Sequence, residues 1–111
     1  KPTPTVEKKP LPPEAEQFLS NMVNIPSLTT NPEGTAAVIA GFERDWNAAN
    51  TELKKYNAYT SLYGSLWAGY NVSRDPAIRA EMKKIQEFLA SRPEWSRYYQ
   101  AALEDKNAFL N

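Results

Sequence analysis

The feature that most constrains the fold is a run of apolar positions through the middle of the chain, spaced alternately by three and four residues. This spacing follows one face of an α-helix, which makes a turn every 3.6 residues. A seam of this length is typical of a helix that packs along its whole length. The positions are Ile39, Phe42, Trp46, Ala49, Leu53, Tyr56, Thr60, Tyr63, Trp67 and Tyr70, of which only Thr60 is polar.

The seam predicts one long central helix from about residue 32 to residue 71. Such a helix would span about 58 Å at ~1.5 Å per residue, whereas a compact domain of this size has a radius of gyration of about 13 Å. Therefore either the domain is elongated or the helix breaks. The sequence favours residues 60–64 as the place of a break, because Gly64 weakens a helix interior.

Helical signals continue on both sides of the seam. Pro13 suits the first turn of a helix that ends before Pro26, and residues 26–31 read as a loop. The apolar positions of this first helix are Ala15, Phe18, Leu19, Met22 and Val23.

A second start signal is the pair Asp75 and Pro76, which predicts an N-cap followed by a first helical residue. Pro93 then separates two helical stretches. The apolar positions are Ile78, Met82, Ile85 and Leu89 in the first stretch, and Trp95, Tyr99, Ala102 and Phe109 in the second. No period-two alternation appears, so the predicted fold class is all-α: an antiparallel helical hairpin or a small four-helix arrangement.

The N-terminal segment differs in composition from the rest. Five of the first thirteen residues are proline, which removes backbone donors and fixes φ. We therefore expect residues 1–12 to be a flexible proline-rich linker and residues 13–111 to be a single helical domain. Because Lys1 is not methionine, we expect a processed or excised piece, exported or tethered to a larger precursor, and the compartment stays open.

Composition removes several classes of chemistry. The chain has no cysteine and no histidine, so it lacks thiolate ligands, imidazole ligands and the usual general base. Carboxylate pairs are the catalytic groups that remain. The neighbouring pair Glu43 and Asp45 does not share a helix face, so it does not form such a site. Lysine plus arginine equals 13, as does aspartate plus glutamate, so charge gives no reason to expect a nucleic-acid partner. We expect no enzyme activity, no metal and no cofactor.

The segment YNAYTSLYGSLWAGY at residues 56–70 is the strongest functional candidate. It has no charge, but asparagine, serine and threonine interrupt it, which argues against a membrane span. On a helical wheel, one face is aromatic and another is made of small residues. Small side chains let a second backbone approach closely, and tyrosine and tryptophan are enriched in interfaces. The predicted partner-binding residues are Tyr59, Tyr63, Gly64, Trp67, Ala68 and Tyr70.

Three functions remain open at this point. The first is a non-enzymatic protein-interaction or assembly module, whose partner is another protein or a second copy of the chain. The second is a ligand-binding domain whose aromatic face lines a pocket for a glycan or an apolar small molecule. The third is a small hydrolase that uses carboxylates. The plainest interpretation of the aromatic face is intramolecular core, and this interpretation overlaps with that of a partner surface, since the segment can serve both.

Overall fold

The structure is a computed structural model that describes residues 10–104. Most of the predicted linker, residues 1–9, lies outside the described residues, as do Phe109 and the rest of segment 105–111.

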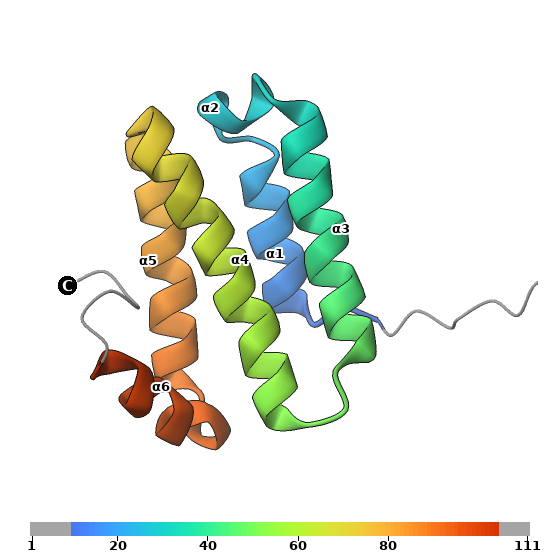
Figure 1. Cartoon of the computed structure of the whole chain (residues 1–111), viewed down its shortest axis with the longest axis vertical. Coiled ribbons are helices and arrows are strands. Elements are labelled where there is room, and N and C mark those ends of the chain that lie inside the picture. The colour runs from blue at the N-terminus through green and yellow to red at the C-terminus, as the bar shows by residue number, and fades with distance from the viewer. Residues whose placement is uncertain (1–9, 105–111) are drawn as a thin grey trace, which may run out of the picture.

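Within the described part, the chain is helical throughout and has no strand, which confirms the all-α prediction. In Figure 1, α1, α3, α4 and α5 alternate in direction and form a small bundle. The short helix α2 lies at one end of the bundle, and α6 lies at the other. The elements are α1 (Pro13–Met22), α2 (Pro26–Thr29), α3 (Pro32–Ala48), α4 (Glu52–Ser73), α5 (Pro76–Ser91), the 3-10 turn η1 (Pro93–Trp95) and α6 (Ser96–Leu103).

The prediction of one helix over residues 32–71 is wrong. The seam is divided between α3 and α4, and the break lies at residues 49–51 rather than at 60–64. Ala49 is in extended conformation with φ −72° and ψ 119°, which turns the chain out of α3. The Thr51 hydroxyl then accepts a hydrogen bond from the Lys54 N–H at 3.2 Å and caps α4. The chain therefore reverses direction, and the two halves of the seam pack side by side.

Two smaller predictions near the N-terminus also need correction. Residues 26–31 are not all loop, because Pro26–Thr29 forms α2, which Pro26 begins. The Thr35 hydroxyl of α3 donates to the Leu28 carbonyl at 2.9 Å and so joins α2 to α3. Val23, predicted to lie on the buried face of the first helix, is the C-cap of α1 and is exposed.

Side-chain caps fix the starts of the later helices. Asn31 Oδ1 accepts from the Gly34 N–H at 3.1 Å at the start of α3. As predicted, Asp75 caps α5: its Oδ1 accepts from the Ala77 N–H at 2.9 Å. These bonds satisfy N–H groups that have no partner within the helix.

The core centres on Tyr59 of α4, which is completely buried. Five aromatic rings from α1, α3, α5 and η1 surround it, with centroid distances from 5.2 to 6.3 Å. They belong to Phe18, Phe42, Trp46, Phe88 and Trp95. The aliphatic positions predicted for α5 complete this core, since Ile78, Met82, Ile85 and Leu89 are fully buried.

Candidate functional site

The structure divides the six predicted partner-binding residues into two groups. Tyr59 and Tyr63 lie in the core and cannot contact a partner directly. Gly64, Trp67 and Ala68 are exposed, and Tyr70 is partly buried. All six lie on α4, but they occupy opposite sides of it, so they do not form one surface.

The exposed group belongs to a surface that we call the outer face of α4. It consists of Asn57, Ser61, Gly64, Ser65 and Ala68, all exposed and uncharged. At Gly64, a methyl group in the Cβ position would meet nothing within 4 Å. The Ser65 hydroxyl donates to the Ser61 carbonyl at 3.1 Å, so its hydrogen is used inside the helix. The outer face is therefore a strip of small side chains on which another backbone could approach closely.

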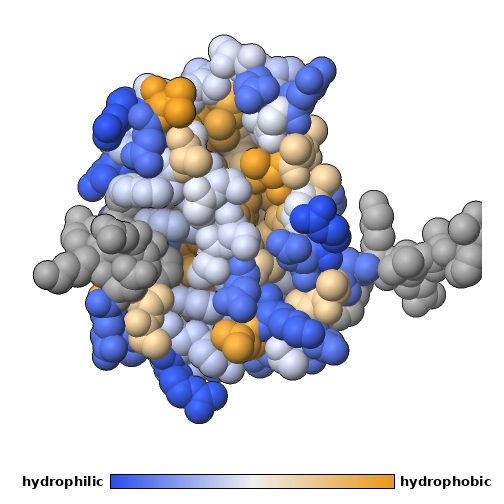
Figure 2. Space-filling view, viewed as in Figure 1, coloured by the Kyte–Doolittle hydropathy of each residue, from blue (hydrophilic) through white to orange (hydrophobic). Residues whose placement is uncertain are grey.

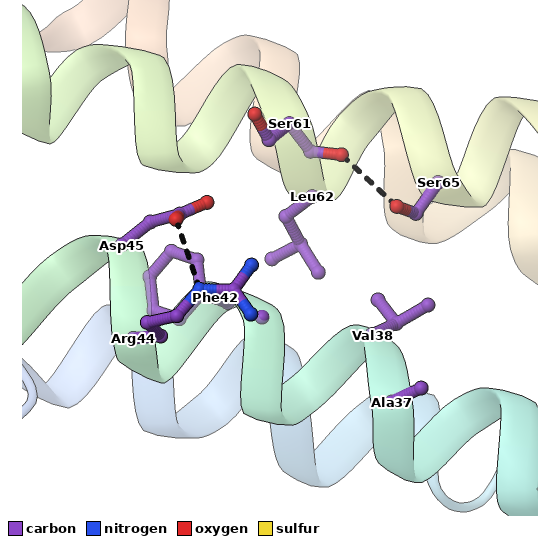
Figure 3. Close-up of a pocket in the computed structure, with 9 residues that line it drawn as sticks. Ala37, Val38, Phe42, Arg44, Asp45, Ser61, Leu62 and Ser65 are labelled. Carbon is purple, nitrogen blue, oxygen red and sulfur yellow. Dashed lines mark hydrogen bonds and ion pairs between the residues drawn. The ribbon is translucent and has the colours of Figure 1, made fainter.

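A hollow that we call the α3–α4 groove runs beside the outer face. Its volume is about 320 Å³. Figure 3 shows Val38, Phe42 and Leu62 at the groove, with Ser61 and Ser65 on the α4 side. In Figure 2, apolar surface is visible between α4 and α3. A second hollow of about 270 Å³ extends the groove toward residues 49–54.

The edge of the outer face carries an aromatic pair, of which Trp67 is exposed and Tyr70 is partly buried. The rings of Trp67 and Tyr70 are stacked, with centroids 6.3 Å apart and an interplanar angle of 25°. The Arg74 guanidinium lies over the Tyr70 ring at 5.6 Å. Tryptophan, tyrosine and arginine are the residue types most enriched among interface residues that dominate binding energy. The pair therefore extends the uncharged strip with a larger contact area.

A separate cavity lies at the end of the bundle where α3 turns into α4, and we call it the end pocket. Its volume is about 240 Å³. It combines aromatic side chains with charged ones of both signs, contributed by α1, α3, α4, α5 and η1. The lining residues are Pro12, Glu14, Trp46, Glu52, Lys55, Tyr59, Phe88, Arg92, Glu94 and Trp95.

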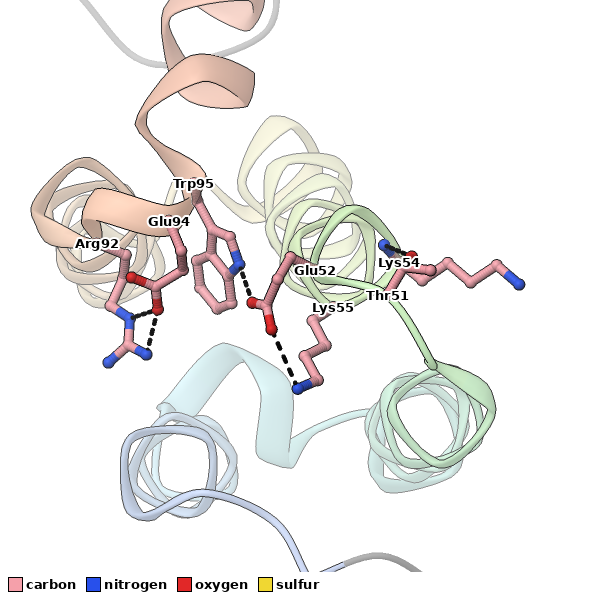
Figure 4. Close-up of polar contacts among 7 residues, drawn as sticks. All are labelled: Thr51, Glu52, Lys54, Lys55, Arg92, Glu94 and Trp95. Atoms are coloured by element: carbon pink, nitrogen blue, oxygen red, sulfur yellow. Dashed lines mark hydrogen bonds and ion pairs between the residues drawn. The ribbon is translucent and has the colours of Figure 1, made fainter.

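Polar contacts organise the rim of the end pocket (Figure 4). Glu52 accepts from Trp95 Nε1 at 2.8 Å and, through its other oxygen, from Lys55 Nζ at 3.4 Å. Arg92 Nε donates to Glu94 at 2.8 Å. The Glu94 pKa is lowered, first by its own backbone N–H and also by Arg92. The two cations also lie over aromatic rings: Lys55 over Trp46 at 5.8 Å, and Arg92 over Trp95 at 5.3 Å.

Two buried tyrosine hydroxyls of α4 have no hydrogen-bond partner among the described residues. They belong to Tyr56 and Tyr59. Burial raises the pKa of Tyr56 to about 12, with a further contribution from Tyr99. Burial also raises the pKa of Tyr59; the nearby Glu14 carboxylate adds to the shift and the Arg92 guanidinium opposes it. Glu14 and Arg92 also line the end pocket, whereas the Tyr59 hydroxyl itself is enclosed by the core.

Sequence reasoning found part of these surfaces and missed the end pocket. The outer face follows from helical spacing alone, because all its residues lie on one helix. The end pocket is built from five elements far apart in the chain, so no spacing could reveal it. The only sign of the end pocket in the sequence was the presence of Trp46 and Trp95, and the helical spacing of apolar residues assigned both to the core.

The described residues contain no cluster of histidine, cysteine, aspartate or glutamate arranged to hold a metal ion. Between residues 10 and 104, no helix combines the length and the apolar content that crossing a bilayer requires. No family model, curated protein or solved structure matches the chain.

Proposed function

We propose that this chain is a non-enzymatic protein-interaction module that pairs through the outer face of α4, with a second copy of the chain as its partner. The observation that carries the proposal is the absence of charge on this exposed face. From residue 56 to residue 73, α4 has no charged side chain, although much of this stretch is exposed. Exposed helix faces normally carry charged residues, whereas the cores of interfaces are depleted of them.

The chemistry of the face favours a copy of itself over a partner of opposite charge. An uncharged surface offers no electrostatic complement to a charged partner, and two copies of it do not repel each other. Gly64 and Ala68 lie one turn apart at the middle of α4 and permit close contact between two helices. An antiparallel arrangement around Gly64 opposes the two helix dipoles and gives a closed two-fold dimer. Trp67 then supplies apolar area at the edge of the contact.

The experiment measures association and melting together for two matched substitutions. Ala68→Leu adds bulk at the centre of the outer face, and Ala80→Leu adds the same bulk at an exposed position of α5. By sedimentation velocity, the wild type and Ala80→Leu should dimerise alike. Ala68→Leu should dimerise roughly 5- to 150-fold more weakly, since overpacking a contact costs ~1–3 kcal/mol.

Melting temperatures separate the interface from a folding defect, because both alanines are exposed and both variants should melt close to the wild type. A monomeric wild type across the concentration series contradicts the proposal. Equal association of the Ala68→Leu and Ala80→Leu variants contradicts it as well.

A further inference from the structure

Val72 is the most exposed large hydrophobic residue among those that the structure describes. It lies in the last turn of α4 and keeps 89% of its surface. Burial of a valine side chain normally stabilises a protein, and the monomer leaves this stabilisation unused. A surface that covers Val72 would therefore gain apolar contact area at the end of α4.

The second hollow of the α3–α4 groove, about 270 Å³ in volume, is a concave feature that could receive such a side chain. The methyl groups of Ala48, Ala49 and Ala58 form the apolar part of its wall. Asp45 and Lys54 also line it and contribute one charge of each sign. The hollow opens beside the outer face of α4, because two residues of that face, at positions 57 and 61, line it as well.

The antiparallel pair proposed above brings these two features to the same height, and the present inference rests on that pairing. In a two-fold pair centred on Gly64, a residue that follows Gly64 is level with the residue that precedes it by the same number of positions in the other copy. Val72 follows Gly64 by eight positions, so it is level with position 56 of the other copy. Lys54 and Ala58, which line the second hollow, lie just before and just after this position.

Val72 and the second hollow also lie on the same edge of α4. Helix positions seven residues apart differ by only about 20° around the axis, so Ala58, Ser65 and Val72 follow one edge. This edge faces α3, because Ala58 and Ser65 both line the α3–α4 groove. A two-fold axis perpendicular to two antiparallel helices keeps this edge on the same side of both copies. Each Val72 is therefore directed to the second hollow of the other copy.

We propose that Val72 of each copy inserts into the second hollow of the other copy, between the end of α3 and the start of α4. The alanine methyl groups receive the valine side chain, and the charged groups of Asp45 and Lys54 stay in water at the rim. The contact occurs twice in the pair and makes α3 part of the interface. It also fixes the register, because a shift along α4 would move both valines out of the hollows.

Crosslinking between single-cysteine variants tests the position of Val72 directly, because the chain has no cysteine of its own. A mixture of Val72→Cys and Lys54→Cys, treated with a short bis-maleimide, should give a covalent dimer on a denaturing gel. Val72→Cys alone should give none, since its two copies would lie about 24 Å apart along the helix axis at ~1.5 Å per residue. A mixture of Val72→Cys and Lys83→Cys is the control, because Lys83 lies on α5, and it should give no covalent dimer.

A pair of matched substitutions tests the contribution of Val72 to association. By sedimentation velocity, Val72→Ser should dimerise about 10-fold more weakly than the wild type, because each dimer loses the apolar contact twice. Val23→Ser makes the same change at an exposed valine of the α1 C-cap and should dimerise like the wild type. Val72→Ser should melt close to the wild type, because the side chain is exposed in the monomer.

Failure of this contact differs in outcome from failure of the pairing itself. A dimer that Ala68→Leu weakens and Val72→Ser leaves unchanged would overturn the contact and keep the outer face of α4 as the interface. A wild-type dimer whose Val72→Cys and Lys54→Cys variants do not crosslink would overturn the contact in the same way. Covalent dimers from Val72→Cys alone would show parallel copies, and a monomeric wild type would overturn both proposals.

Discussion

At the scale of single residues, Arg74 has an unusual backbone. It is the only residue other than glycine with positive φ among those described, at φ 58° and ψ 23°. It ends α4, and its N–H bonds to the Tyr70 carbonyl at 2.7 Å. Glycine is the usual residue at such a position, because a Cβ in the left-handed region is costly.

We expect Arg74→Gly to be more stable than Arg74→Ala by about 1 kcal/mol, although glycine is the poorer helix former. Both substitutions remove the contact of Arg74 with the Tyr70 ring. The difference between their unfolding free energies therefore reports the cost of placing a Cβ in the left-handed conformation. Urea denaturation of the two variants measures it. An alanine variant as stable as the glycine variant would show that the left-handed conformation carries no strain.

The cap at Asp75 predicts a dependence of stability on pH. The Ala77 N–H and then Ser27 lower the Asp75 pKa below its ordinary value of 3.8. A lowered pKa means that the folded state favours the carboxylate, so the stabilisation is present above pH 3.8 and is lost as the pH falls below it. Asp75→Asn keeps an acceptor but cannot ionise.

The wild type should therefore melt above Asp75→Asn at pH 7, and the difference should shrink as the pH falls toward 3. Thermal melts at several pH values measure this difference. A difference that stays constant, or grows in acid, would refute the assigned role of the carboxylate.

At the scale of elements, the break between α3 and α4 depends on Thr51. Its hydroxyl caps α4, and replacement of such a cap by alanine costs about 1 kcal/mol. Thr51→Ala should lose this amount of unfolding free energy in a urea titration. Thr60→Ala is the matched control, because the Thr60 hydroxyl bonds to the Asn57 carbonyl within α4 and caps nothing. Equal losses in the two variants would argue against the cap.

The missed break shows what helical spacing can and cannot predict. Positions three and four residues apart define a face but do not define whether the chain continues or reverses. Ala49 keeps the spacing and is buried, yet it lies after the last residue of α3. Leu53 keeps the spacing and is exposed. The stronger signal was local: Thr51 followed by Glu52 is an N-cap with an acidic first turn.

For the aromatic segment, the sequence predicted the presence of two faces but not which side chains are buried. The sequence correctly predicted that residues 56–70 present two different faces. It could not show which tyrosines are covered, because that depends on neighbours contributed by α1, α5 and η1. Tyr59 and Tyr63 proved to be core, while Trp67 retains 37% of its surface. Consequently the outer face of α4 depends on Gly64, Ala68 and their serine neighbours more than on tyrosine.

At the scale of the whole molecule, the two candidate surfaces lie on different sides of α4. The inner side of the helix holds the core and contributes Glu52, Lys55 and Tyr59 to the end pocket. The outer side is exposed and uncharged over most of its length.

The central claim is that two copies meet along the outer face of α4, and a distance between copies tests it most directly. The chain has no cysteine, so a single spin label can be attached to Asn57→Cys on the outer face or to Lys83→Cys on α5. In an antiparallel pair centred on Gly64, two labels at position 57 should lie on the order of 20–30 Å apart, given ~1.5 Å per residue and a close helix contact. Double electron–electron resonance should detect this distance in the Asn57→Cys protein, and a longer one in the Lys83→Cys protein. A shorter distance at position 83 than at position 57, or no dipolar coupling from position 57, would contradict the account.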